Sequence, residues 1–281
     1  MIDYYYLNGQ LVPAKEATLR VNDLSILRGY GIFDYFLIRE RRPLFIEDYL
    51  DRFLRSAETM HLAFPLSRQE LRAAILELIE TNGQREGSIR LVLTGGYADD
   101  GYTPRAPNLI MLQHAMPRPP REYYEGGVKL LTHPYQRELP EVKTINYMQG
   151  IYLLPQLRRA GALEPLYYQG DLIRESVRSN IILVTEDNRL LTPGSNILFG
   201  VTRRKVLELA RNYFEVEERD VHLEELTNAR EAFLTGSNKR IMPVVQIDEQ
   251  VLGDGKPGVV TRRLMELFEA YTMEYLASPV G

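Results

Sequence analysis

The stretch PEVKTINY at residues 140–147 and the stretch RESVRSNII at residues 174–182 decide how this chain is interpreted. The first places a single lysine, Lys143, between Val142 and Thr144, and the second places Glu175 shortly before a strand-like run. Taken alone, each has an ordinary interpretation, because lysine and glutamate are mostly solvated surface residues. Their meaning therefore depends on the rest of the chain.

The composition around these stretches excludes several classes of protein. The chain has 281 residues, with 34 Lys plus Arg against 38 Asp plus Glu, and this balance argues against a nucleic-acid-binding protein. The absence of cysteine excludes disulfides, thiolate metal sites and a cysteine nucleophile. Neither a signal peptide nor an apolar run of about 20 residues is present, so we expect a soluble, cytoplasmic protein without a membrane partner.

The N-terminal part of the chain mixes strand and helix patterns. Asn8-Gly9 between two short runs, 4–7 and 10–12, predicts a β-hairpin, because this pair supplies the positive φ angles of a tight turn. Apolar residues recur at helical spacing over 47–61. A second helix is predicted to begin with the capping box at 67–70 and to end at Asn82-Gly83. Strands are predicted at 89–94 and 109–112.

A proline-rich stretch, MPRPPR at 116–121, predicts the boundary between two domains, because prolines favour an extended path. We place a small domain at 1–116, a linker at 117–125 and a larger domain at 126–281. The larger domain has predicted strands at 128–131, 166–168 and 181–184 and predicted helices at 202–213 and 260–276. Both halves mix strands and helices, so the fold class is α/β or α+β.

Several common sites can be set aside. GDGKPG at 253–258 lacks the spacing of a phosphate-binding loop, and no Gly-x-Ser-x-Gly nucleophile elbow is present. No two of the four histidines have the spacing of a metal site, so we predict no metal; they are His61, His114, His133 and His222.

In combination and order, the two opening stretches resemble the class IV aminotransferases, the pyridoxal-phosphate enzymes of fold type IV. That family includes branched-chain and D-amino-acid transaminases and aminodeoxychorismate lyase. The resemblance extends over nearly the whole chain, through the segments 28–34, 49–57, 192–193, 200–203, 233–237 and 258–261. It implies a small N-terminal α/β domain, a larger C-terminal pseudo-barrel domain and the cofactor in the cleft between them. It also implies a homodimer whose active site lies at the subunit interface.

The resemblance assigns roles to three residues of the opening stretches. Lys143 would form the Schiff base with pyridoxal 5'-phosphate and then move the proton between the substrate Cα and the cofactor, which needs an amine that is both nucleophile and base. Glu175 would keep the pyridine nitrogen protonated, so that the ring accepts electrons. Tyr147 would hydrogen-bond the phenolate oxygen of the cofactor.

The cofactor phosphate needs a cation and several directed donors. Arg52 matches the arginine that binds phosphate in the family, although Tyr49 stands where relatives usually have histidine. Val201 and Thr202, at the start of a predicted helix, and Ser237, after Gly236, match the positions of the other donors.

The substrate carboxylate must be held by groups that fix its orientation, and these groups decide the stereochemistry. The loop GGYADDGY at 95–102 lacks the Arg-x-His pair of the well-studied bacillary D-amino-acid transaminases. Three cations, Arg28, Arg178 and Lys239, match positions that face the pocket in the family. Unneutralised cations there would be costly without a bound anion, so we expect a substrate with one or two carboxylates.

This pattern resembles a subgroup of D-amino-acid transaminases in which arginines replace the Arg-x-His pair. It implies a transaminase that acts on D-alanine or D-glutamate and on 2-oxoacids such as 2-oxoglutarate. An L-branched-chain transaminase is the first alternative, although it would need an apolar pocket. Aminodeoxychorismate lyase is the next, and a protein that keeps the fold and binds the cofactor without catalysis is the last.

Overall fold

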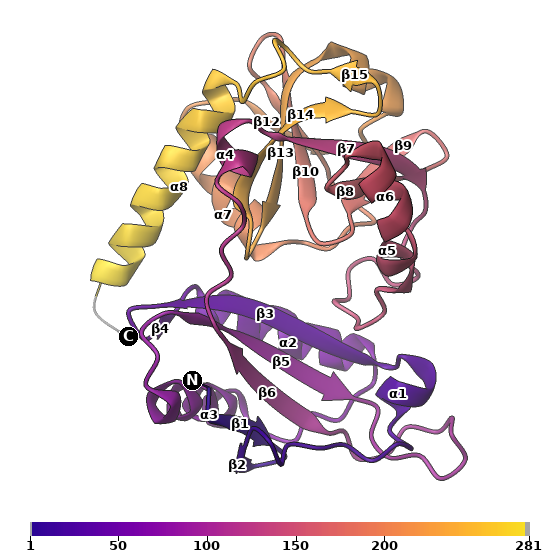
Figure 1. Ribbon diagram of the computed structural model, residues 1–281, viewed down its shortest axis with the longest axis vertical. Coiled ribbons are helices and arrows are strands. Elements are labelled where there is room, and N and C mark those ends of the chain that lie inside the picture. Colours follow the sequence, from indigo (N-terminus) through magenta and orange to yellow (C-terminus); the bar gives the residue numbers. More distant parts are fainter. Residues whose placement is uncertain (1, 279–281) are drawn as a thin grey trace. The chain divides into compact units, whose positions relative to one another are not determined.

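The computed structural model describes residues 2–278, and these residues form two compact units (Figure 1). Unit 1 comprises residues 2–117 and 142–146 together with Ser278, and unit 2 comprises Arg118–Glu141 and Tyr147–Ala277. The predicted linker at 117–125 includes the boundary between Pro117 and Arg118, and it also contains a short helix, α4 (Glu122–Glu125). The five residues 142–146, which carry Lys143, belong to unit 1 although both flanking segments belong to unit 2.

Unit 1 is built on a six-stranded sheet with the strand order β2-β1-β6-β5-β3-β4. All the pairings between its neighbouring strands are antiparallel. Helix α2 packs along β3, and helix α3 packs against β1 and β6. The elements are β1 (Tyr4–Leu7), β2 (Gln10–Pro13), α1 (Leu24–Arg28), β3 (Gly31–Arg39), β4 (Arg42–Pro43), α2 (Ile46–Thr59), α3 (Arg68–Asn82), β5 (Gly87–Thr94) and β6 (Leu109–His114).

Local signals account for most of these elements, and the corresponding predictions are confirmed. Asn8 and Gly9 have φ angles of 49° and 94° in the turn between β1 and β2. The side chain of Ser67 accepts a hydrogen bond from the backbone N–H of Glu70, which closes the predicted capping box of α3. At its other end, Gly83 takes the left-handed conformation with φ 64°.

Unit 2 contains a nine-stranded sheet, in which eight strands follow the order β12-β11-β10-β13-β14-β7-β8-β9 and β15 pairs with β14. The strands are β7 (Val128–Pro134), β8 (Glu164–Gln169), β9 (Leu172–Ser176), β10 (Asn180–Thr185), β11 (Leu190–Pro193), β12 (Val216–Arg219), β13 (Ala229–Gly236), β14 (Arg240–Ile247) and β15 (Gln250–Val251). Parallel pairs, β7 with β8, β7 with β14 and β11 with β12, occur among antiparallel ones.

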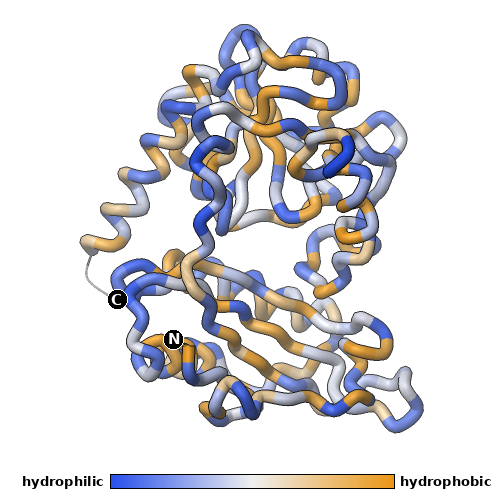
Figure 2. The backbone as a smooth tube through the Cα atoms, viewed as in Figure 1, coloured by the Kyte–Doolittle hydropathy of each residue, from blue (hydrophilic) through white to orange (hydrophobic). Residues whose placement is uncertain are grey.

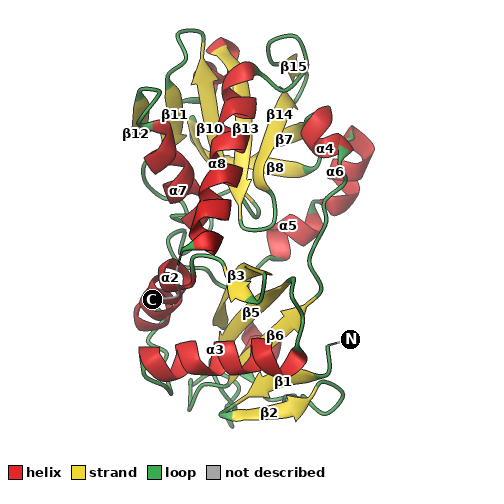
Figure 3. Ribbon diagram, turned by 90° about the vertical axis from the view of Figure 1, so that its left-hand side faces the viewer, coloured by secondary structure: helices red, strands yellow, loops and turns green. Residues whose placement is uncertain are grey.

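Helices α7 and α8 pack against each other and against the strands of this sheet (Figure 3). The remaining helical elements are α5 (Met148–Tyr152), α6 (Leu154–Ala160), α7 (Val201–Ala210), the 3-10 helix η1 (Leu223–Asn228) and α8 (Val259–Ala277). Apolar residues run along the strands of each unit (Figure 2), and one buried cluster in unit 2 includes Ile181, Leu183, Leu234 and Val244. Over residues 2–278, no helix combines the length and the apolar character needed to cross a membrane.

The sequence predictions missed several elements. The short helices α5 and α6 and the charged strand β12 carry no regular apolar stripe, so hydrophobic periodicity does not reveal them. The predicted helix at 202–213 ends earlier, at Ala210, and is followed by a turn.

Candidate functional site

Lys143 lies on a short extended segment that pairs with the first residues of β3. The backbone N–H of Phe33 donates to the carbonyl of Lys143 at 2.9 Å, and the N–H of Ile145 donates to the carbonyl of Gly31 at 3.1 Å. The Lys143 Nζ lies 4.6 Å from the centre of the Phe33 ring, and the side chain is half-buried. This segment therefore extends the sheet at the free edge of β3 and presents its amine beside an aromatic face.

Gly31 is required for this pairing. A Cβ at position 31 would lie 2.8 Å from the carbonyl oxygen of Leu93 and 3.2 Å from the Ile145 side chain. A larger residue would collide with the backbone of β5 and would crowd Ile145, which lies in the segment with Lys143.

Arg52 is not the surface cation that an amphipathic helix would suggest. Its side chain is buried, and it donates from Nε and Nη2 to the two carboxylate oxygens of Asp34, at 2.9 and 2.6 Å. Asp34 is itself fully buried in β3. The Arg52 guanidinium also lies 5.2 Å from the centre of the ring of Tyr49, one helical turn earlier. The phosphate role of Arg52 stays a prediction, and the arginine has a carboxylate partner within unit 1.

Arg28 is the last residue of the short helix α1 and is exposed. The helix is anchored by the buried Asp23, whose carboxylate accepts hydrogen bonds from Ser25, Thr94 and Asn108. Within residues 2–278 the guanidinium of Arg28 has no carboxylate partner, and its hydrogen bond goes to the carbonyl of Leu27 at 3.1 Å. Unit 1 therefore has a cation without a carboxylate partner, within residues 2–278, at the end of a helix that Asp23 anchors.

Glu175 lies near the end of β9 in unit 2, and its carboxylate is buried. Oε1 accepts hydrogen bonds from Nε and Nη2 of Arg137, at 2.9 and 2.6 Å. Oε2 accepts from the backbone N–H of Leu198 at 3.0 Å and from Asn180 Nδ2 at 3.4 Å. The guanidinium favours the ionised form of this carboxyl group, and the other two donors fix its orientation.

The same contacts connect Glu175 to the start of α7. Asn180 also donates to the carbonyl of Leu198 at 2.7 Å, and its side chain leaves room only for glycine at position 200, where a Cβ would lie 2.3 Å from its oxygen. Val201 and Thr202 follow as the first two residues of the helix, and both are buried. In the described part of the chain no side chain caps this N-terminus, so its first N–H groups suit an anion such as a phosphate.

The remaining predicted cofactor residues also lie in unit 2. Tyr147 is half-buried at the N-terminus of α5. Ser237 is half-buried in the turn between β13 and β14, directly after Gly236. Among residues 2–278 no group of three or more acidic, histidine or cysteine side chains is arranged to hold a metal ion.

Lys239 and Arg178 are not independent unneutralised cations, because they share one buried carboxylate, and one positive charge of the pair remains unbalanced. Both contact the buried carboxylate of Glu164, with Lys239 Nζ at 2.7 Å and Arg178 Nε at 2.9 Å from Oε1. The sequence reading missed Glu164 because a single glutamate between alanine-leucine and proline gives no sign of burial. The two residues differ in exposure, since the side chain of Arg178 is 60% exposed and that of Lys239 only 9%.

Arg137 and Asp34 were also missed as partners of predicted site residues. Asp34 had a visible signal, because it is the one charged residue in the otherwise uncharged run 31–38. Arg137 had no signal, since it lies in the irregular segment after β7 and meets Glu175 only through the fold.

Comparison with known proteins places these features in a family. The family model described as amino-transferase class IV matches residues 31–247. A Methanocaldococcus jannaschii protein named "Putative branched-chain-amino-acid aminotransferase" is 32% identical over 276 residues, covering 94% of each chain. A D-alanine aminotransferase of Bacillus licheniformis is 26% identical and covers 97% of this chain and 98% of its own. The crystal structure of the Escherichia coli branched-chain amino acid aminotransferase superposes with a TM-score of 0.90 at 25% identity, covering 96% of this chain and 94% of its own.

Proposed function

The chain belongs to the class IV aminotransferases, and on that premise we propose that it is a D-amino-acid transaminase. It would move the amino group of a D-amino acid such as D-alanine or D-glutamate to a 2-oxoacid such as 2-oxoglutarate. The family works with pyridoxal 5'-phosphate, and when bound this cofactor supplies the electron sink that stabilises negative charge on the substrate Cα.

The residues of this chain divide the task. The uncapped N-terminus of α7, with Val201 and Thr202, fits the phosphate group, and Arg52 and Ser237 are its further donors. Tyr147 would donate a hydrogen bond to the phenolate oxygen of the cofactor. Glu175, held in its ionised form by Arg137, fits a protonated ring nitrogen.

Lys143 provides the amine that holds the cofactor and then moves the proton. Its Nζ lies 4.6 Å from the centre of the Phe33 ring and its side chain is half-buried, so the amine is positioned beside an aromatic face and is partly shielded from water. Loss of the amine removes both functions, so Lys143→Ala should have no transaminase activity and should lack the visible absorbance of the bound cofactor.

The main support for the D-amino-acid proposal is Arg28. Its guanidinium is exposed and has no carboxylate partner within residues 2–278. An arginine at the end of an anchored helix is well suited to hold a substrate carboxylate through two parallel hydrogen bonds. The D-alanine aminotransferase of Bacillus licheniformis, similar over nearly the full chain, adds support from a relative.

The test is a single-turnover reaction with the pyridoxal-loaded enzyme. D-alanine should convert the cofactor to its pyridoxamine form, and L-leucine should not. Conversion by L-leucine alone would overturn the proposal. Arg28→Met should raise the KM for D-alanine about tenfold, through loss of a charged hydrogen bond. The matched control is Arg55→Met, which removes an exposed arginine from helix α2 and should leave the KM unchanged.

The second candidate is an L-branched-chain transaminase, which the name of the Methanocaldococcus jannaschii relative favours. The same single-turnover experiment separates the two candidates, because the hand of the reacting amino acid differs.

We further propose that the protein acts as a homodimer. Several apolar side chains are strongly exposed in the chain as described, and exposed apolar groups favour association. In unit 1 they are Ile26 and Leu27 on α1, and in unit 2 they are Met148, Ile151 and Tyr152 on α5.

A further inference from the structure

Five polar side chains in unit 2 converge on one buried point that the roles above do not use. Glu164 is the first residue of β8, and Ser176 is the last residue of β9. Arg178 and Ser179 lie in the turn between β9 and β10, and Lys239 lies in the turn between β13 and β14. Because β8 pairs with β9 and β10 pairs with β13, the sheet brings the start of β8, the β9–β10 turn and the β13–β14 turn close together.

The carboxylate of Glu164 is the centre of this cluster. Oε1 accepts from Lys239 Nζ at 2.7 Å and from Arg178 Nε at 2.9 Å. Oε2 accepts from Ser176 Oγ at 2.6 Å and from Ser179 Oγ at 3.3 Å. Lys239 Nζ also donates to Ser179 Oγ at 2.9 Å. Burial alone would raise the pKa of Glu164, but Lys239 and Arg178 together lower it to about 2, so the group is ionised.

The charges of the cluster do not cancel. Glu164 and Lys239 form a buried pair, with 1% and 9% of their side chains exposed, and they balance each other. Arg178 adds one further positive charge at the surface of the cluster, where 60% of its side chain is exposed. Only its Nε is used by Glu164, and within residues 2–278 its two terminal nitrogens have no acceptor.

We propose that Glu164 and Lys239 are positioning residues that prepare Arg178 to bind a carboxylate of the substrate. Glu164 holds the guanidinium at Nε, so the two terminal amino groups point away and remain available for a bidentate contact. Lys239 balances the charge of Glu164, so that the positive charge of Arg178 remains for the substrate. This inference rests on the proposed function, because it takes Arg178 as a substrate contact.

Lys239 therefore has a different role from the one that the sequence suggested. It is too deeply buried to meet a substrate, and its ammonium group already contacts Glu164 and Ser179. Without it, Glu164 and Arg178 would form a neutral pair, and a neutral pair attracts an anion only weakly.

The experiment measures the binding of glutarate to the pyridoxal-loaded enzyme, followed by the change in cofactor absorbance. Glutarate has two carboxylates and no stereocentre, so its affinity does not depend on whether the enzyme uses D- or L-amino acids. Lys239→Met should weaken glutarate binding about tenfold, since it removes the charge that balances Glu164. Lys239→Arg, which keeps the charge, should recover most of the affinity.

The double variant Glu164→Gln with Lys239→Met makes the test specific for charge. It restores the single positive charge of the cluster, and the glutamine oxygen can still accept from Arg178 Nε, so glutarate should bind within about threefold of the wild type. Lys256→Met, at an exposed turn of unit 2, is the matched control and should leave the affinity for glutarate unchanged.

Two outcomes would overturn the inference: unchanged affinity in Lys239→Met, or a double variant that binds as weakly as a folded Lys239→Met. If Lys239→Met does not fold, the double variant decides, because it contains no unpaired buried charge. Failure of the proposed function is distinguishable. An enzyme that converts only L-leucine is an L-amino-acid transaminase, which contradicts the proposed function. If its Lys239 and Glu164 variants still bind glutarate with the expected relative affinities, the inference about Glu164 and Lys239 stands.

Discussion

The carboxylate of Glu175 is fixed by a cation that the sequence did not reveal. Arg137 donates to it twice, and the side chains of the pair are only 15% and 7% exposed. A buried carboxylate that loses its cation is free to rotate or to take up a proton. The role proposed for Glu175 therefore depends on Arg137, although Arg137 is assigned no contact with the substrate.

We predict that Arg137→Met lowers kcat about 10- to 100-fold while the KM for the amino acid changes less than twofold, by analogy with the loss seen when residues that support metal ligands are removed. Arg137→Lys should recover only part of the loss, because an ammonium group cannot make the paired contact. Steady-state kinetics on the loaded enzyme provide the check. A large rise in KM with an unchanged kcat would contradict this role.

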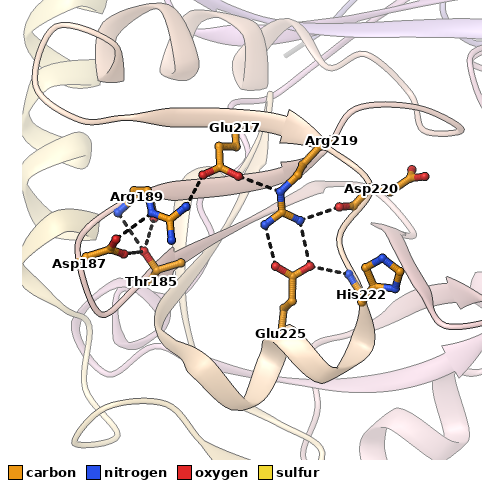
Figure 4. Close-up of polar contacts among 8 residues, drawn as sticks. All are labelled: Thr185, Asp187, Arg189, Glu217, Arg219, Asp220, His222 and Glu225. Carbon is orange, nitrogen blue, oxygen red and sulfur yellow. Dashed lines mark hydrogen bonds and ion pairs between the residues drawn. The ribbon is translucent and has the colours of Figure 1, made fainter.

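The edge strand β12 shows how an element can form without an apolar pattern. Its sequence is VEER, and its charged side chains take part in a chain of ion pairs (Figure 4). Arg189 contacts Asp187 and Glu217, and Arg219 contacts Glu217 and Glu225. These side chains are partly exposed, so each ion pair alone contributes little to stability. Together the ion pairs favour the pairing of β12 with β11.

His222 extends this region to the turn after β8. Its Nδ1 lies 2.8 Å from Asp171 Oδ2, and this hydrogen bond raises the pKa of His222 above its ordinary value of 6.5. Because the folded-state pKa is raised, the stabilisation is full below pH 6.5 and is lost as the pH rises through the folded-state pKa. The contact thus stabilises the fold mainly in mildly acidic solution.

His222→Gln should therefore lower the thermal midpoint of the apoenzyme more at pH 6 than at pH 9. Asp171→Asn should produce the same pH dependence, and the double variant should add nothing to it, because both changes remove one interaction. Equal losses at the two pH values would show that the pair does not titrate as described.

Elements with regular apolar patterns were predictable from the sequence, and elements held by specific partners were not. The hairpin β1–β2 and the helices α2 and α3 follow from turn residues, apolar spacing and a capping box. Strand β12 follows from ion pairs that form only in the folded chain. The same division holds at the candidate site, where the family resemblance predicted roles for Lys143 and Glu175 but their contacts with Phe33 and Arg137 could not be predicted.

The substrate cations show the limit of the same reasoning. The sequence indicated three cations but not the counter-charge of Lys239 and Arg178, because Glu164 lies far from Lys239 along the chain and contacts it only in the folded structure. Of these three cations, only Arg28 has no carboxylate partner within residues 2–278.

The whole chain should behave as a dimer in solution. Light scattering should give about twice the 32.5 kDa mass of one chain. Ile151 on α5 is 65% exposed, so Ile151→Asp should weaken the dimer by placing a charge in an apolar contact. Val251→Asp, at a residue that is 56% exposed in β15, is the control and should leave the mass unchanged. A fully active monomer would contradict the proposed assembly.

The short segment 142–146 also has a consequence for the time at which the N-terminal unit can fold. The edge of β3 at Gly31–Phe33 stays open until residues 142–146 are available, and these residues are made well after residues 2–117 of unit 1. At typical rates of translation, the ribosome needs about 2 to 6 seconds to add the residues between 117 and 146. During that interval the nascent chain has most of its first sheet but an unpaired edge, which is the kind of surface that chaperones and other nascent chains recognise. The segment that carries Lys143, the residue proposed to hold the cofactor, is thus also the one that closes this edge of the first sheet.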